Sequence, residues 1–216
     1  MSNNFTKAWA RWAPLFSFGG SRHYWTQRYR LGGDSGVGSE GPAAHYKAKI
    51  LNDFVAAQGV ESLIELGCGD GRQLELAKYP SYLGIDVSSE AIEQCRKRFN
   101  GDLSKRFQVL TDYHGESADL ALSLDVIYHL VEDATYHEHL RSLFSAGKRF
   151  VIVYSSNVLV SGRNFRHVRH RAVSEDIARL HPEFERMKEV EEALPAPVAF
   201  NRGIPTVFLV YRRKVA

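Results

Sequence analysis

The strongest constraint on the fold is an alternation of short apolar segments with segments of helical periodicity, which begins at Ser62. The apolar segments predict strands at 63–66, 82–86, 107–110, 118–124 and 149–154, and the intervening segments predict helices at 73–78, 89–99 and 135–144. Strands that alternate with helices form βαβ units and a parallel sheet. The run 150–154 is apolar throughout, as expected of a strand that is buried on both faces.

The rest of the chain extends this pattern. A helix is predicted at 42–58, with Pro42 in its first turn and Gly59 as its stop. A helix at 174–180 precedes two predicted strands, at 184–193 and 206–212, which form an antiparallel hairpin at the sheet edge. We therefore predict an α/β fold with a doubly wound, mostly parallel, seven-stranded sheet that is Rossmann-like and has an antiparallel last strand.

Residues 1–41 are predicted to precede the main domain, which we place at 42–216. Four aromatic residues between Phe5 and Phe16 are spaced by three or four, as on one face of a helix. Such a helix packs on its own domain or on a partner subunit, which is compatible with a homodimer. Residues 32–41 contain five glycines and are predicted to form a loop.

A glycine-rich turn lies between the first predicted strand and the helix that follows. It contains Gly67, Gly69 and Gly71, and Asp86 ends the next strand about 20 residues later. This spacing predicts a nucleoside-containing ligand whose ribose binds Asp86. The third glycine of the dinucleotide fingerprint is missing, and Glu65 and Asp70 make the turn acidic. A pyrophosphate is disfavoured there, and a cationic or zwitterionic ligand is favoured.

These segments resemble the class I S-adenosylmethionine-dependent methyltransferases. The resemblance covers Ile64-Glu65-Leu66-Gly67-Cys68-Gly69-Asp70-Gly71, Gly84-Ile85-Asp86-Val87-Ser88, Asp112, and Ser123-Leu124-Asp125-Val126-Ile127-Tyr128-His129. It implies that Gly67 and Gly69 line the methionine and ribose, that Asp86 holds the ribose hydroxyls and that Asp112 approaches the adenine amine. Leu124 and Asp125 would lie near the sulfonium, and Glu65, Cys68 and Val87 complete the expected cofactor site.

The earlier glycine loop is similar to a segment that covers the cofactor in a subset of this family. On that resemblance Arg28, Tyr29, Gly33 and Ser35 join the cofactor site, as part of a lid that closes on the substrate. Arg28 is expected to pair with the methionine carboxylate, because arginine favours bidentate contacts with carboxylates. The alternative is a flexible linker that joins a docking helix to the domain.

His129 and Tyr128 are the catalytic candidates. They follow the fourth predicted strand, where the acceptor enters in this fold, and histidine suits proton transfer near neutral pH. The alternative is a packing role for His129 at the strand end. Asp125 and His129 are four residues apart, but Tyr128 stands where metal-dependent relatives carry a glutamate. We therefore predict no metal.

A basic segment follows the fifth predicted strand. Residues 162–171 contain four arginines and two histidines, whereas the whole chain has a net charge of only +3. The candidates for binding the acceptor are His167, Arg169, His170 and Arg171, since arginine matches carboxylate and phosphate geometry. The alternative is a solvated loop that pairs with the acids of 183–192.

The predicted function is methyl transfer from S-adenosylmethionine to a small, anionic acceptor, such as a saccharide or a natural-product hydroxyl, phosphate or carboxylate. The alternatives are an RNA- or protein-modifying methyltransferase and a non-catalytic cofactor-binding subunit. Basic character confined to one segment argues against nucleic acid as the partner. Two cysteines, no apolar run of 18 residues and no signal-peptide pattern predict a cytoplasmic protein without a membrane span.

Overall fold

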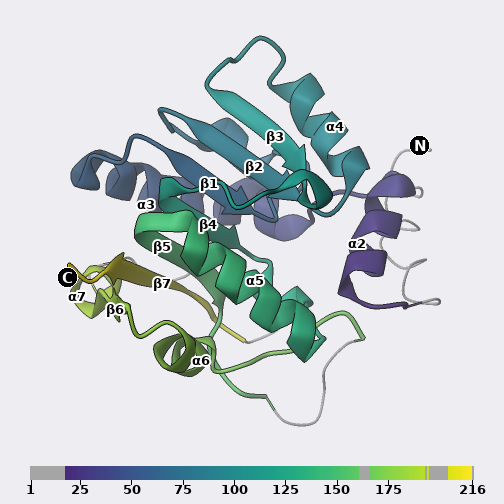
Figure 1. Cartoon of the computed structure of the whole chain (residues 1–216). Helices are drawn as coiled ribbons and strands as arrows, with labels where there is room; N and C mark the ends of the chain where they lie inside the picture. Colours follow the sequence, from purple (N-terminus) through teal and green to yellow (C-terminus); the bar gives the residue numbers. More distant parts are fainter. Residues whose placement is uncertain (1–17, 161–165, 193, 195–203, 216) are drawn as a thin grey trace.

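The centre of the molecule is a seven-stranded sheet in the order β3-β2-β1-β4-β5-β7-β6 (Figure 1). A computed structural model describes residues 18–160, 166–192, 194 and 204–215. The strands are β1 (Leu63–Leu66), β2 (Tyr82–Asp86), β3 (Lys105–Val109), β4 (Ala118–Leu124), β5 (Gly147–Ser156), β6 (Phe184–Arg186) and β7 (Thr206–Arg213). Strands β1 to β5 pair in parallel, and β7 is antiparallel to both β5 and β6. The predicted doubly wound sheet with an antiparallel last strand is confirmed.

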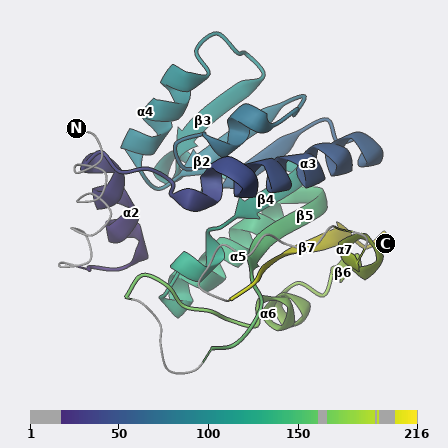
Figure 2. The same ribbon diagram turned by 180° about the vertical axis from the view of Figure 1, so that it is seen from behind.

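Helices cover both faces of this sheet (Figures 1 and 2). They are α3 (Gly41–Gln58), α4 (Ser89–Arg98), α5 (Asp133–Ala146), α6 (Val173–Leu180) and α7 (Lys188–Glu192). On one face, Leu51 of α3, Ile92 of α4 and Val190 of α7 belong to one apolar cluster with the strands. On the other face, Leu140 of α5 and Ile177 of α6 belong to a second cluster. Each strand end thus has a fixed position relative to the helices that follow it.

Local signals set several helix boundaries. Ser88 caps α4, because its hydroxyl accepts a hydrogen bond from the Ala91 amide. Gly59 ends α3 in the left-handed conformation, with a φ of 56°. Pro42 lies in the first turn of α3, as predicted.

Two predicted elements differ in the structure. The charged segment at 184–193 is a strand only at Phe184–Arg186 and then becomes α7. The Glu191 side chain accepts hydrogen bonds from Arg186 and from the Val210 amide, and these bonds fold the segment back on β7. The predicted helix at 73–78 is a 3₁₀ turn, η2 (Gln73–Leu76), because Ala77 is already extended. The predicted helix around residues 5–16 lies outside the described residues.

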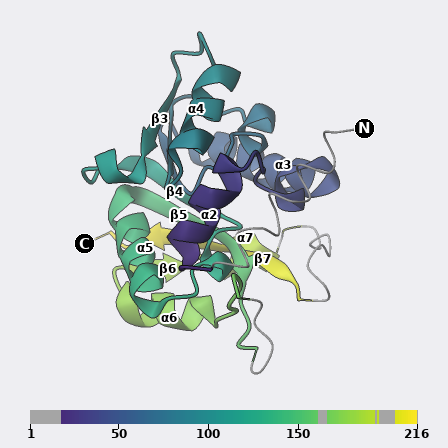
Figure 3. The ribbon, with the colours of Figure 1, turned by 90° about the vertical axis from the view of Figure 1, so that its right-hand side faces the viewer.

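Helix α2 (Ser21–Arg30) stands across the edge where the parallel strands end (Figure 3). At its first residue, Ser21 donates hydrogen bonds to the Glu132 carboxylate through its amide and hydroxyl, at 2.9 and 2.7 Å. The same hydroxyl accepts from the Val131 amide. These contacts fasten α2 to the segment between β4 and α5. Of the helices described, none has the length and apolar character needed to cross a membrane.

Candidate functional site

A cavity lies at the carboxyl ends of β1, β2 and β4, between α2 and α5. Its walls are Ser21, Arg22, Trp25, Tyr29, Ser35, Ser39, Lys47, Glu65, Leu66, Gly67, Cys68, Gly69, Gln73, Ile85, Asp86, Val87, Leu110, Leu124, Asp125, Val126, His129, Leu130, Thr135, Glu138, His139 and Ser142. Ligands of open α/β sheets bind outside the carboxyl ends of the strands. The cavity is therefore where this fold places its chemistry.

The glycine turn after β1 forms the floor of the cavity. Gly67, Gly69 and Gly71 have φ values of 92°, 59° and 78°, in the left-handed region that favours glycine. A side chain at Gly67 would collide with Val126, and one at Gly69 would collide with Ser35. The glycines thus let the backbone approach the segment after β4 and the earlier glycine loop, leaving space for a ligand.

Asp86 ends β2 at the edge of this turn. Its Oδ2 accepts from the Gly69 amide and its Oδ1 from the Ser88 amide, both at 2.9 Å. Burial raises the pKa of Asp86 to about 6, although these amide hydrogen bonds oppose the shift. The carboxylate lines the cavity with its position fixed, as an acceptor for ribose hydroxyls must be.

Glu65 supplies a second buried carboxyl from β1. The Tyr82 hydroxyl donates to it at 2.6 Å. Burial raises the pKa of Glu65 to about 7, and the charge of Lys47 partly offsets that rise. In the absence of a ligand, Glu65 and Asp86 therefore hold their protons more tightly than exposed carboxyls do.

Asp125 joins the end of β4 to α3 and to the segment that follows. It has a φ of 59° and is the sole non-glycine residue with positive φ in the part of the chain that the structure describes. Lys47, buried on α3, forms an ion pair with its Oδ2. The Tyr128 hydroxyl donates to its Oδ1 at 2.9 Å. These partners hold Asp125 in a conformation that residues other than glycine rarely adopt.

Tyr128, a predicted catalytic residue, has Asp125 as its hydroxyl's partner in this structure. Burial holds the pKa of the Tyr128 hydroxyl well above its usual value, and its proton is donated to Asp125. Tyr128 lies beside a smaller pocket on the other side of Asp125 and is absent from the walls of the main cavity. Its hydroxyl positions Asp125.

The earlier glycine loop reaches the glycine turn through Ser35. The Ser35 hydroxyl and amide both donate to the Asp70 carboxylate, and the Tyr29 hydroxyl bonds the Ser35 hydroxyl at 2.8 Å. Ser35 and Tyr29 line the cavity, as predicted. Arg72 also forms ion pairs with Asp34 and Glu40 of this loop.

Arg28 has partners other than those expected. Its guanidinium is buried, donating to the backbone carbonyl and the carboxylate of Asp34 at 2.6 and 3.1 Å and to the Tyr24 hydroxyl. Gly33 packs on Arg28, where a side chain would collide. Neither residue lines the cavity. In this structure Arg28 stabilises the loop from within and is not available to a methionine carboxylate.

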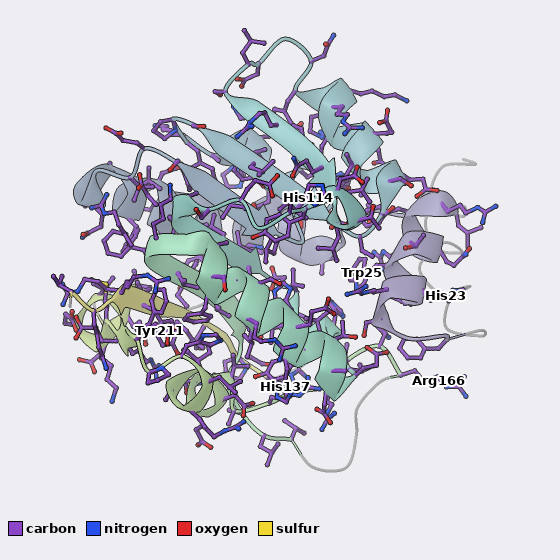
Figure 4. All side chains as sticks on the ribbon, viewed as in Figure 1. His23, Trp25, His114, His137, Arg166 and Tyr211 are labelled. Carbon is purple, nitrogen blue, oxygen red and sulfur yellow. The ribbon has the colours of Figure 1, made fainter. Side chains whose placement is uncertain are left out.

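His129 ends the short turn η4 (Ile127–His129) and lines the cavity. Its Nδ1 lies 2.9 Å from the His167 backbone carbonyl, which can only accept, so Nδ1 carries the proton and Nε2 is the basic nitrogen. The Trp25 ring meets the imidazole edge-on, with centroids 4.9 Å apart. Figure 4 shows Trp25 on the side of α2 that faces the sheet and His23 on the other side. Burial lowers the pKa of His129 to about 3.

The described part of the basic segment, 166–171, has partners within the chain. Arg169 and Arg171 both bond the Asp133 carboxylate and the Val131 carbonyl, and Arg171 also bonds the Leu130 carbonyl. His170 Nδ1 is paired with the Ser156 hydroxyl at 2.7 Å. None of these three, nor His167, lines the cavity. The positive charge of Arg169 and Arg171 fastens the segment to the start of α5. Arg169 and Arg171 pair with Asp133 and not with the acids of 183–192, the predicted alternative.

Of the remaining predicted residues, some line the cavity and others do not. Cys68, Val87 and Leu124 line the cavity. Asp112 lies on an exposed turn, η3 (Leu110–Asp112), where its carboxylate bonds Thr111. It is Leu110 of that turn that reaches the cavity. Within the described residues, no group of three or more His, Cys, Asp and Glu side chains is placed to hold a metal.

The sequence did not indicate the walls formed by α2, α3, α5 and the turn η2. These residues are Ser21, Arg22, Trp25, Lys47, Gln73, Thr135, Glu138, His139 and Ser142. Arg22 pairs with Glu138 across the cavity mouth at 2.8 Å. The aromatic pair Tyr24-Trp25 was a usable signal, whereas the polar face of α5 looks like any solvated helix face.

The cavity fits S-adenosylmethionine, a zwitterion with an added sulfonium charge. Its charged walls comprise the carboxyls Glu65, Asp86, Asp125 and Glu138 and the cations Arg22 and Lys47. The excess of carboxyls suits a cation, and Asp86 suits a ribose. The apolar side chains Val87 and Leu110 at the β2 and β3 ends suit an adenine ring.

Comparisons with known proteins agree with this geometry. A family model described as a methyltransferase domain matches residues 64–149. The tRNA (carboxymethyluridine(34)-5-O)-methyltransferase alkbh8 of Xenopus tropicalis is 28% identical over 111 residues, which is 49% of this chain and 17% of that protein. The chain thus spans about a sixth of the length of this curated relative.

Two solved structures share the fold. Magnesium protoporphyrin IX methyltransferase of Synechocystis PCC 6803, with bound S-adenosylhomocysteine, has a TM-score of 0.60 at 14% identity over 98% of both chains. The N-methyltransferase NodS of Bradyrhizobium japonicum WM9, also with S-adenosylhomocysteine, has a TM-score of 0.63 at 17% identity, covering 81% of this chain and 89% of that one. The family model thus matches residues 64–149 as a methyltransferase domain, and the chain shares the fold of these two S-adenosylhomocysteine-bound methyltransferases.

Proposed function

We propose that this chain transfers the methyl group of S-adenosylmethionine to a hydroxyl of a small polar acceptor, with His129 as the proton acceptor. The observation that carries the proposal is the cavity, which both the glycine turn and His129 line. Arg22, at the cavity mouth, replaces the 166–171 segment as the candidate contact for an anionic group on the acceptor.

The cofactor supplies an electrophilic methyl group on its sulfonium. The chain orients the acceptor and removes its proton. A pKa of about 3 keeps the His129 ring neutral at physiological pH, so Nε2 is ready to accept. The low pKa makes it a weak base, which suffices because an alcohol oxygen becomes strongly acidic as it gains a methyl group. The His167 carbonyl keeps one proton on Nδ1 of His129 while Nε2 accepts the proton of the acceptor.

His129→Ala tests this role with radiolabelled S-adenosylmethionine and a panel of hydroxylated small molecules. We expect kcat to fall at least about 100-fold, with S-adenosylhomocysteine affinity unchanged. His139→Gln is the matched control, because His139 lines the same cavity but its Nε2 is already paired with Ser123. Equal rates for His129→Ala and the wild type would contradict the proposal.

RNA is the second candidate acceptor, because the Xenopus relative carries a tRNA methyltransferase name. The same assay separates the two: label recovered in added tRNA, and not in small molecules, would favour RNA. Pairing of Arg169 and Arg171 with Asp133 removes two cations from the surface that such a substrate would use.

Residues 32–41 act as a lid in this proposal. The bonds from Ser35 to Asp70 and from Arg72 to Asp34 and Glu40 support it, because they tie the loop to the cofactor turn. Limited proteolysis should cut 32–41 more slowly with S-adenosylhomocysteine present. Equal cutting rates with and without this ligand would favour the flexible linker.

A further inference from the structure

Gln73, a residue that lines the cofactor cavity, carries an unpartnered carboxamide oxygen among the described residues. Gln73 begins η2, directly after the glycine turn, and lines the cavity. Its Nε2 donates to the Ala44 carbonyl at 3.0 Å. Its Oε1 is buried and, among the residues that the structure describes, has no hydrogen-bond partner. A buried amide oxygen left unpaired costs free energy, which a hydrogen-bond donor on a ligand would recover.

The orientation of this amide is fixed by its partner. The Ala44 carbonyl can only accept a hydrogen bond, so the NH₂ group of Gln73 must face it. The oxygen therefore occupies the other position and presents an acceptor. The ligand group that satisfies it must be a donor.

The place of Gln73 in the fold indicates which end of the cofactor it meets. Ala44 lies one turn before Lys47 on α3, and Lys47 pairs with Asp125 at the end of β4. Strand β1 lies between β4 and β2, and β2 carries Asp86. Gln73 is thus on the α3–β4 side of the cavity, away from the ribose acceptor. A cofactor with its ribose at Asp86 extends its amino-acid end toward this side.

We propose that Gln73 Oε1 accepts a hydrogen bond from the α-ammonium group of S-adenosylmethionine and S-adenosylhomocysteine. An ammonium has three donors and no acceptor, so it suits this oxygen, whereas the ligand carboxylate would be repelled by it. Glu65 also lines the cavity and adds a carboxyl to it. The proposal rests on the proposed function only through the cofactor.

The test compares two ligands by calorimetry. S-adenosylhomocysteine carries the amino-acid end, and 5′-methylthioadenosine lacks it. In Gln73→Met we expect the Kd for S-adenosylhomocysteine to rise about 10-fold or more, and the Kd for methylthioadenosine to stay within about 2-fold. Gln108→Met is the matched control. The Oε1 of Gln108 is also buried and unpartnered among the described residues and its Nε2 is paired with Glu116, but Gln108 does not line the cavity.

The outcomes separate the possibilities. An equal loss for both ligands in Gln73→Met, or no loss, would overturn the assignment of Gln73. A wild type that binds neither ligand would overturn the cofactor assignment as well. Gln73→Ala, which removes the same oxygen, repeats the comparison if Gln73→Met does not melt like the wild type. Replacing the ligand's amine with hydrogen should weaken binding to the wild type and cost less in Gln73→Met, completing a double-mutant cycle.

Discussion

The glycine turn at 67–71 and the basic segment, described at 166–171, were both predicted to bind ligands, but only the turn lines the cavity. The turn presents Gly67, Cys68 and Gly69 to the cavity. The basic segment directs Arg169 and Arg171 to Asp133 and to backbone carbonyls. The glycine turn forms part of the cavity, and the basic segment attaches itself to the segment between β4 and α5.

The difference lies in what each prediction depended on. The turn is a backbone feature, and its left-handed glycines determine its shape wherever the rest of the chain lies. The prediction for the basic segment depended on a count of charges, and such a count does not identify the residues that pair with them. Asp133 is more than 30 residues away in the sequence, and only the packing of the segment on α5 brings it close.

The largest expected effect is on the glycine turn. Asp86→Ala removes the ribose acceptor and leaves the Gly69 amide unpaired, so we expect the Kd for S-adenosylhomocysteine to rise about 100-fold, roughly 3 kcal/mol. Asp112→Ala is the control, because Asp112 is exposed and outside the cavity. Calorimetry should show less than about a 3-fold change for that variant. A comparable loss at Asp112 would restore its predicted contact with adenine.

Substitutions in the basic segment should change the free energy of unfolding. The Arg171 side chain is 7% exposed and bonds two carbonyls and Asp133, so Arg171→Ala should lower the free energy of unfolding by about 2–3 kcal/mol. The Arg169 side chain is 40% exposed, and Arg169→Ala should cost less than about 1 kcal/mol. Urea denaturation measures both. If Arg171→Ala left the free energy of unfolding unchanged and weakened acceptor binding, the segment would be an anion site, as predicted.

The smallest effect is the pH dependence of cofactor binding. Burial raises the pKa of Glu65 to about 7 and that of Asp86 to about 6, so both bind protons more tightly in the folded, ligand-free protein than in the unfolded chain. Their contribution to stability therefore falls as pH rises from about 4 to 7. A cationic ligand favours the carboxylates, so S-adenosylmethionine affinity should rise up to about 10-fold between pH 5.5 and 7.5.

Glu65→Gln is the control for that dependence. Removing the group with the higher pKa should flatten the affinity profile above about pH 6. Affinity that falls with rising pH in the wild type would show that neither carboxyl loses a proton when the ligand binds. Calorimetry in buffers of different ionisation enthalpy counts the protons released.

Most of the fold and about half of the site could be predicted from the sequence. Strand positions and the glycine turn follow from local periodicity and backbone chemistry, and Asp86 follows from its spacing. Glu138 and His139 could not be predicted, because they meet the cavity only where α5 packs beside the strand ends. Arg28 was assigned from its residue type, and its partner Asp34 competes for the same guanidinium.

Hydrogen–deuterium exchange with and without S-adenosylhomocysteine tests the contrast between the two regions most directly. The glycine turn and the end of β2 should gain protection on binding, because their amides border the ligand and the Asp86 carboxylate. Segment 166–171 should exchange at the same rate in both states. Protection confined to 166–171, or equal in the two regions, would contradict the account.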